Sequence, residues 1–314
     1  MLRLVLGRRS LLGGLALAEA VMAGPVLGQG AAPAEGGAFG APEAAFSPGG
    51  RFGEAFIAAL REAERAGGGR LGVAVLDTAT RAWATWRGAE RFPLASTFKL
   101  VLAGAVLREV DEGREDLERR VPIEASDLVD YAPVTEKRVG PEGMRVGELL
   151  EAVMVWSDNA AANLLLPLVG GPEGLTERAG DWGDAGFRLD RRETALGEGR
   201  PGDPRDTTTP NFMLVSMERL LVGNLLSAPL RGLLNAWMIG CRTGDTKIRA
   251  GLPQGWICGN RSGAAGFGTS NDVAAIWPPG GRPILVAAYL TESAAPLQAR
   301  DAALAAVGRA VAAT

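Results

Sequence analysis

Ser96 and Lys99, three residues apart, are the pair best suited to chemistry in this sequence. Both lie in the largely apolar segment 92–102. If a helix begins at Ser96, the hydroxyl and the Lys99 amine project from one face, close enough to exchange a proton. Apolar neighbours disfavour the ammonium form of Lys99, so its free amine can activate the hydroxyl. The spacing predicts a serine nucleophile with a lysine base.

The same pair also fits an ordinary helix cap, because Ser-x-x-Lys arises by chance at average residue usage. Lysine is scarce in this chain, however, and only Lys99, Lys137 and Lys247 occur. The sequence contains no histidine at all. Every Ser-His-Asp mechanism and every His-ligated metal site is therefore excluded.

Two later segments offer partners for this pair. Residues 157–159 read Ser-Asp-Asn between two predicted helices, where a hydroxyl and an amide can both face a cleft. Alone, they also fit the N-cap of the helix that follows. Residues 259–263, Gly-Asn-Arg-Ser-Gly, fall on a predicted strand whose glycines let a ligand approach the backbone. An edge strand with a solvated arginine is the alternative.

Apolar periodicity indicates the elements that must position these residues. It predicts helices over residues 52–66, 96–112, 145–156, 160–169, 175–179, 209–221, 230–239 and 296–313. It predicts strands over residues 70–77, 82–87, 256–262, 271–277 and 283–290. Strands at both ends with helices between them predict an α/β (α+β) fold: an antiparallel sheet built from the N- and C-terminal segments and flanked by helices, with an inserted all-α subdomain. The α/β part takes residues 51–94 and 241–314, and the all-α part residues 95–240.

The N-terminal 50 residues read as export sequence rather than fold. Two arginines in segment 7–12 precede an apolar stretch over 11–22 that is short for a membrane span. We expect a twin-arginine signal over 1–28 and a periplasmic or secreted protein, with a membrane anchor as the alternative. Residues 29–50, rich in Gly, Ala and Pro, predict a disordered leader. In an oxidising compartment Cys241 and Cys258 can pair, but spacing alone does not show it.

Composition limits the remaining function classes. The 314 residues are 47% hydrophobic and 22% charged, with a net charge of -3. This composition is typical of a globular protein with a full core. Basic and acidic residues are interspersed, so no stripe suits a nucleic acid. We expect a monomer that acts on a small molecule without metal or cofactor.

The three motifs, Ser-x-x-Lys at 96–99, Ser-Asp-Asn at 157–159 and Arg-Ser-Gly at 261–263, occur in the order that class A β-lactamases and penicillin-binding proteins use. From about residue 52 to the end, the chain closely resembles class A β-lactamases. The matching stretches are 92–99, 131–136, 154–163, 189–205 and 256–263. The resemblance implies the serine β-lactamase/transpeptidase-like fold. It also implies hydrolysis of the β-lactam ring of penicillins and cephalosporins, with antibiotic resistance as the result.

The resemblance also assigns roles for catalysis. Ser96 attacks the lactam carbonyl, and either Lys99 or Glu193 through water takes its proton, an assignment that is disputed for the family. Ser157 relays a proton to the leaving nitrogen. The oxyanion lies between the backbone N–H groups of Ser96 and Ala264. Glu193, in a segment like the family's Ω-loop, then activates the deacylating water.

Substrate-binding roles follow in the same way. Asn159 is expected to hold the substrate's side-chain amide, and Tyr131 to wall the entrance. The residues expected to bind the ring carboxylate or shape its pocket are Thr243, Lys247, Arg261, Ser262 and Gly263. A transpeptidase or carboxypeptidase, or a β-lactam sensor without turnover, would share most of this set but would not need Glu193. These two functions are the alternatives.

The chain departs from the family pattern at two positions. Arg261 stands where lysine is commoner, as in the branch that handles carbenicillin. A guanidinium can bind a carboxylate bidentately, so we expect activity on carboxypenicillins. Gly197 stands where most members have an asparagine that helps hold the deacylating water. The missing amide predicts slower deacylation.

Overall fold

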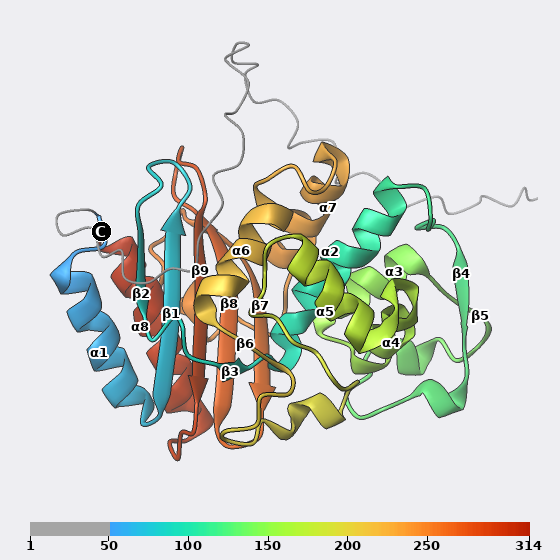
Figure 1. Cartoon of the computed structure of the whole chain (residues 1–314), viewed down its shortest axis with the longest axis horizontal. Helices are drawn as coiled ribbons and strands as arrows, with labels where there is room; N and C mark the ends of the chain where they lie inside the picture. The colour runs from blue at the N-terminus through green and yellow to red at the C-terminus, as the bar shows by residue number, and fades with distance from the viewer. Residues whose placement is uncertain (1–50) are drawn as a thin grey trace, which may run out of the picture. The chain divides into compact units, whose positions relative to one another are not determined.

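A five-stranded antiparallel sheet organises the described part of the chain, residues 51–314 of this computed structural model (Figure 1). Its strands are β1 (Arg70–Asp77), β2 (Trp83–Trp86), β7 (Ile257–Ala265), β8 (Thr269–Trp277) and β9 (Ile284–Thr291), in the order β2-β1-β9-β8-β7. Early and late parts of the chain therefore share one sheet, as predicted, and the α/β class is confirmed. The expected signal (1–28) and leader (29–50) lie outside the described residues.

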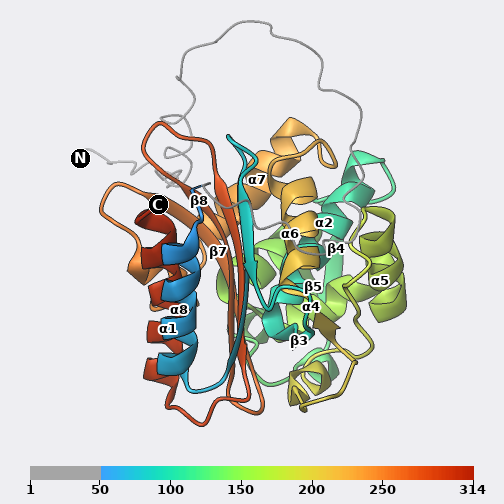
Figure 2. The same ribbon diagram turned by 60° about the vertical axis from the view of Figure 1, so that its left-hand side comes forward.

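Helices α1 (Glu54–Gly67) and α8 (Leu297–Ala312) cover one face of the sheet (Figure 2). Phe56, Ile57 and Leu60 recur at helical spacing along α1 and are buried against the sheet. The helix ends at Gly68, whose φ of 62° is a left-handed conformation that favours glycine. This layer closes a core of its own, separate from the core around α2 that the Ser96–Lys99 motif adjoins.

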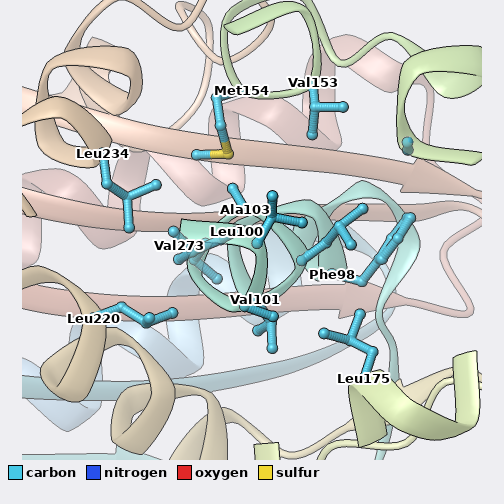
Figure 3. Packing of buried hydrophobic residues seen from close by; sticks show 14 of the residues in the cluster. Phe98, Leu100, Val101, Ala103, Val153, Met154, Leu175, Leu220, Leu234 and Val273 are labelled. Carbon is cyan, nitrogen blue, oxygen red and sulfur yellow. The ribbon is translucent and has the colours of Figure 1, made fainter. Parts of the chain in front are cut away.

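The opposite face of the sheet packs against the helical part of the molecule. Its helices are α2 (Phe98–Asp111), α3 (Val146–Glu151), α4 (Asn159–Leu165), α5 (Gly171–Asp181), α6 (Pro210–Leu221) and α7 (Ala228–Ile239). Helix α2 runs through the middle and is buried on all sides over its first ten residues, which suits their almost entirely apolar sequence. Figure 3 shows Phe98, Leu100 and Val101 of α2 among side chains from the neighbouring helices and the sheet. The element that carries the Ser96–Lys99 motif is therefore held on all sides.

Several short elements differ from the sequence prediction. Two small sheets were not predicted: β3 (Phe92–Pro93) with β6 (Thr207–Thr208), and β4 (Arg120–Ile123) with β5 (Gly140–Arg145). These strands are too short or too polar to show an alternating pattern. Short 3₁₀ turns cover Ala95–Thr97, Ala125–Asp127, Thr135–Lys137, Leu166–Val169, Ala195–Glu198 and Ile248–Gly251, and a π-helical turn covers Ala152–Trp156. Among residues 51–314, no helix is both long enough and apolar enough to span a membrane.

Candidate active site

Ser96 lies in the turn Ala95–Thr97 that leads into α2. A Cβ built on Gly263 of β7 would come within 3.0 Å of the backbone nitrogen of Ser96. Any larger residue would crowd the turn, so glycine suits this close approach of the edge strand, and Ala264 is the next residue along that strand. No side chain caps the N-terminus of α2, so the helix-cap alternative for Ser96 is not what the structure shows.

Lys99 is the centre of the polar cluster at this end of α2. Its Nζ lies 3.0 Å from Ser96 Oγ and 3.0 Å from Glu193 Oε1. It also donates to Ser157 Oγ at 3.3 Å and to Asn159 Oδ1 at 2.5 Å. The side chain is fully buried, and this burial lowers the pKa of Lys99 to about 8, although the Glu193 carboxylate opposes the shift. Near neutral pH the free amine is therefore a minor form, but far more abundant than for an ordinary lysine.

The turn that carries Ser157 and Asn159 is both a helix cap and part of this cluster. The cap of α4 is made by Asp158, whose carboxylate accepts from Ala161 N and is completely buried. Ser157, at φ 62°, and Asn159 are then free to face Lys99. The amide nitrogen of Asn159 donates to the Asp130 carbonyl at 2.8 Å. Within the Ser-Asp-Asn motif, Asp158 therefore caps the helix, while Ser157 and Asn159 face the Lys99 cluster.

Tyr131 stands at the outer edge of the same region. Its carbonyl accepts a hydrogen bond from the Asn159 backbone at 3.0 Å, while its residue surface is 56% exposed. Its backbone has a left-handed conformation, with a φ of 64°, which makes a sharp turn in the chain beside the Ser157 segment. An exposed aromatic side chain next to the motif fits the expected wall of an entrance.

Glu193 is fixed by Asn163, a residue that the sequence analysis did not single out. The Asn163 amide donates to the Glu193 carbonyl at 2.8 Å and accepts from the Glu193 nitrogen at 3.0 Å. Asn163 lies four residues after Asn159 on α4, so both face one side of the helix. That spacing is the signal that could have identified it.

Contacts on both sides of Glu193 also hold its loop in place. Arg191 pairs with the buried Asp206 at 2.5 Å, and Asp206 also accepts from the Arg191 backbone. Gly197 accepts a hydrogen bond from Gly266, at 2.9 Å, which ties the loop to the β7–β8 turn. A Cβ on Gly197 would meet nothing within 4 Å. Space for a side chain at this position is therefore open.

Arg261 is completely buried on β7, and most of its donors are used inside the protein. Its guanidinium donates to the carbonyls of Val153 (3.2 Å), Met154 (2.7 Å) and Ser262 (3.3 Å), and to the Thr243 hydroxyl. A guanidinium has five N–H groups, so one remains for a ligand. Arg261 therefore offers one free N–H group, whereas a bidentate contact needs two, and the expected sharing of the carboxylate with Ser262 and Thr243 stays a prediction. The hydroxyls of Thr243 and Ser262, 2.8 Å apart, lie beside the remaining donor.

Lys247 is not part of this pocket, contrary to the sequence expectation. Its Nζ donates to Ser270 and pairs with Asp301 of α8, and the side chain is buried. Nearness in sequence to the Arg261 pocket was misleading, because the turn that holds Thr243 directs Lys247 toward the α8 side of the sheet.

The two cysteines do not form the disulfide that an oxidising compartment allows. Cys241 and Cys258 are both buried and both free thiols. Burial raises the pKa of the Cys258 thiol to about 12, which keeps it protonated. Within residues 51–314, no cluster of three or more His, Cys, Asp or Glu side chains is arranged to hold a metal ion.

Comparisons with known proteins agree with this geometry. Residues 55–314 match the model of the Beta-lactamase enzyme family. The chain is 42% identical over 252 residues to β-lactamase OXY-2 of Klebsiella oxytoca, covering 80% of this chain and 87% of the relative. It is 45% identical over 250 residues to β-lactamase AST-1 of Nocardia asteroides, covering 80% of each.

A solved structure gives the same result. The structure of an ancestral (GNCA) class A β-lactamase superposes with a TM-score of 0.80 at 54% identity, covering 82% of this chain and 98% of the other. Together with the family match over the whole described fold, this likeness leaves one assignment. The chain belongs to the Beta-lactamase enzyme family and is a class A serine β-lactamase, a hydrolase that opens the β-lactam ring.

Proposed function

We propose that Ser96 is the nucleophile and Lys99 the base that takes its proton. The observation that carries this proposal is the position of Lys99 Nζ, 3.0 Å from Ser96 Oγ and 3.0 Å from Glu193 Oε1. An amine with a pKa near 8 is matched to proton transfer at neutral pH. Ser96 then forms an acyl-enzyme as the lactam C–N bond breaks, and Ser157 passes the proton to the leaving nitrogen.

The backbone N–H groups of Ser96 and Ala264 stabilise the oxyanion of this step. The tight packing of Gly263 on the nucleophile turn supports that role, because it brings the two N–H groups into one region. Glu193, held by Asn163, then takes a proton from water, and the resulting hydroxide attacks the ester carbonyl. As the bond from the carbonyl carbon to Ser96 Oγ breaks, the proton returns from Glu193 to the Ser96 oxygen, which regenerates the free enzyme. Hydrolysis of the ring inactivates the antibiotic and so confers resistance.

We propose penicillins, including carboxypenicillins, and cephalosporins as substrates. The ring carboxylate accepts from the one remaining N–H of Arg261 and from the hydroxyls of Ser262 and Thr243. Asn159 holds the side-chain amide and Tyr131 borders the entrance. Carbenicillin hydrolysis at a rate comparable to that of benzylpenicillin would support the carbenicillin-hydrolysing branch, and a far slower rate would contradict it.

One experiment tests turnover itself. Purified protein is mixed with a large excess of a chromogenic cephalosporin, and the product is counted per mole of enzyme. We expect many turnovers. A burst of one equivalent followed by no further hydrolysis would instead indicate a sensor or a transpeptidase that acylates without efficient release.

We also propose that the protein is exported through the twin-arginine route and acts as a monomer outside the cytoplasm. The arginine pair Arg8-Arg9, followed by a short apolar stretch, supports export. Replacing both arginines with lysine should retain the protein in the cytoplasm, as cell fractionation would show. Unchanged export would contradict the route.

A further inference from the structure

A buried polar pair, Asn260 and Asp272, lies behind the Arg261 strand and takes no part in the mechanism above. Both side chains are completely buried. The Asn260 amide nitrogen donates to Asp272 Oδ1 at 2.9 Å, and its oxygen accepts from Arg249 Nη2 at 2.9 Å. Since arginine can only donate and a carboxylate can only accept, these partners fix the orientation of the amide. The pair is therefore part of an ordered hydrogen-bond network.

This pair holds the segment 241–249, which follows α7 in the connection to β7, at two points. Asn260 Nδ2 donates to the Gly244 carbonyl at 3.3 Å. Asp272 Oδ2 accepts from the Ile248 nitrogen at 3.1 Å. A Cβ on Gly244 would lie 2.0 Å from Asn260 Nδ2, so glycine is needed for this approach. The connection cannot shift without breaking hydrogen bonds to the pair.

Thr243, next to Gly244, links this connection to the substrate pocket. Its hydroxyl lies 2.8 Å from Ser262 Oγ and accepts from Arg261. Its carbonyl accepts from Ser262 Oγ at 2.8 Å. The position of the Thr243 backbone therefore sets where both hydroxyls and the remaining Arg261 donor point.

We propose that Asn260 and Asp272 are positioning residues for the substrate carboxylate. Through Gly244 and Ile248 they hold Thr243 against Arg261 and Ser262, and so set affinity for the carboxylate without touching it. The inference rests on the proposed role of the Arg261 pocket.

The charge of Asp272 makes this support dependent on pH. Burial raises the pKa of Asp272 to about 7, although the hydrogen bond from Asn260 and the nearby Lys247 oppose the shift. The charged and titratable groups of the surrounding elements are Lys247 and Arg249 from the connection, Arg261 and Cys258 from β7, and Asp301 from α8. Below pH 7 a protonated Asp272 accepts less strongly from Asn260 and Ile248. Carboxylate binding therefore weakens as the pH falls through this range.

The test compares a penicillin with its methyl ester, which has the same ring but no anionic carboxylate. Kinetics are measured for wild type, Asn260→Leu and Asp272→Asn. In both variants the ratio of kcat/KM for the acid to that for the ester should fall about tenfold, the effect of one lost hydrogen bond to a charged group. The loss should appear in KM, with kcat for the acid little changed. Equal losses on both substrates, or no loss, would overturn the inference.

Ser270→Ala is the matched control. Ser270 lies in the neighbouring buried cluster and contacts Lys247 and Asp301, but neither Gly244 nor Ile248. It should leave the acid-to-ester ratio unchanged. If Asn260→Leu does not fold, Asp272→Asn, which keeps the side-chain volume, decides the outcome. In wild type the ratio should also fall below pH 7, and in Asp272→Asn it should be flat with pH.

The same data separate this inference from the proposed substrate pocket. If wild type hydrolyses acid and ester equally well, the carboxylate role of the Arg261 pocket fails. The positioning inference alone fails under a different result. In that result wild type and Ser270→Ala prefer the acid and Thr243→Ala loses the preference, but the Asn260 and Asp272 variants keep it.

Discussion

The molecule contains two buried lysines beside a serine hydroxyl and a carboxylate, on opposite faces of its sheet. Lys99 contacts Ser96 and Glu193 on the α2 side. Lys247 contacts Ser270 and Asp301 on the α8 side. The two sets have the same chemical groups, and yet only one is proposed to act.

Access and extra donors distinguish the two clusters. Ser96 is partly exposed and has the N–H groups of the β7 edge close by, whereas Ser270 is completely buried. Lys99 has two further partners, Ser157 and Asn159, that can pass protons or bind substrate. A nucleophile therefore needs an open side and an oxyanion site as well as a base, and the Lys247 cluster is structural.

Replacing each lysine with methionine should give opposite results. Lys99→Met should lower acylation by roughly 10²–10⁴-fold, the usual contribution of a positioned base. Lys247→Met should keep turnover but lower the free energy of unfolding by about 1–3 kcal/mol, because Asp301 loses its charged partner and keeps only the hydroxyls of Thr246 and Ser270. Chromogenic cephalosporin kinetics and urea unfolding measure the two effects. Similar losses of activity in both variants would contradict a catalytic role for Lys99 and a structural role for Lys247.

Replacing the carboxylate of each cluster should likewise affect turnover only in the Lys99 cluster. Glu193→Gln should still be acylated but should hydrolyse the acyl-enzyme roughly 10²–10⁴-fold more slowly, because an amide cannot take the water's proton. A covalent penicilloyl adduct should then accumulate in mass spectra of the intact protein. Asp301→Asn is the control and should show no adduct. Turnover by Glu193→Gln at the wild-type rate would remove Glu193 from deacylation.

The pH dependence of acylation sharpens the role of Lys99. Only the free amine can take the Ser96 proton, so the acylation rate should rise with pH and level off above about pH 8. The Glu193 carboxylate raises the pKa of Lys99, so its removal lowers that pKa further. In Glu193→Gln the rising limb should therefore move to lower pH, as stopped-flow acylation would show. A limb that stays in place would mean that Lys99 is not the base.

The sequence predicted much of this arrangement because its strongest patterns are local. The apolar run around Lys99 and the strand predicted over residues 256–262 indicated the two elements that hold the motifs. The failures come from contacts between distant segments. Asn163, which fixes Glu193, is an ordinary helical asparagine until the loop folds onto it. Lys247 looked like a pocket residue because sequence distance does not show which face of the sheet a side chain reaches.

The sequence left the pairing of Cys241 and Cys258 open for a related reason. Two buried cysteines in one region do not establish that their sulfurs can meet, and the structure keeps both as thiols. Titration of the denatured, unreduced protein should therefore find two thiols per chain. A value near zero would contradict the free-thiol assignment.

The smallest expected effect concerns Gly197, on the loop that separates the Lys99 cluster from the surface. Its backbone is held by Gly266, and an added Cβ meets nothing within 4 Å, so the side chain of an asparagine can begin here without displacing the loop. A new amide near Glu193 can hold the deacylating water, and one such hydrogen bond is worth about 1 kcal/mol, or roughly fivefold in rate. Gly197→Asn should therefore speed turnover of simple penicillins several-fold and slow any turnover of bulky cephalosporins or carbapenems, which need the open space. Steady-state kinetics on both groups test this, with Gly202→Asn as a control farther along the same loop. Unchanged rates on both groups would show that position 197 does not position the water.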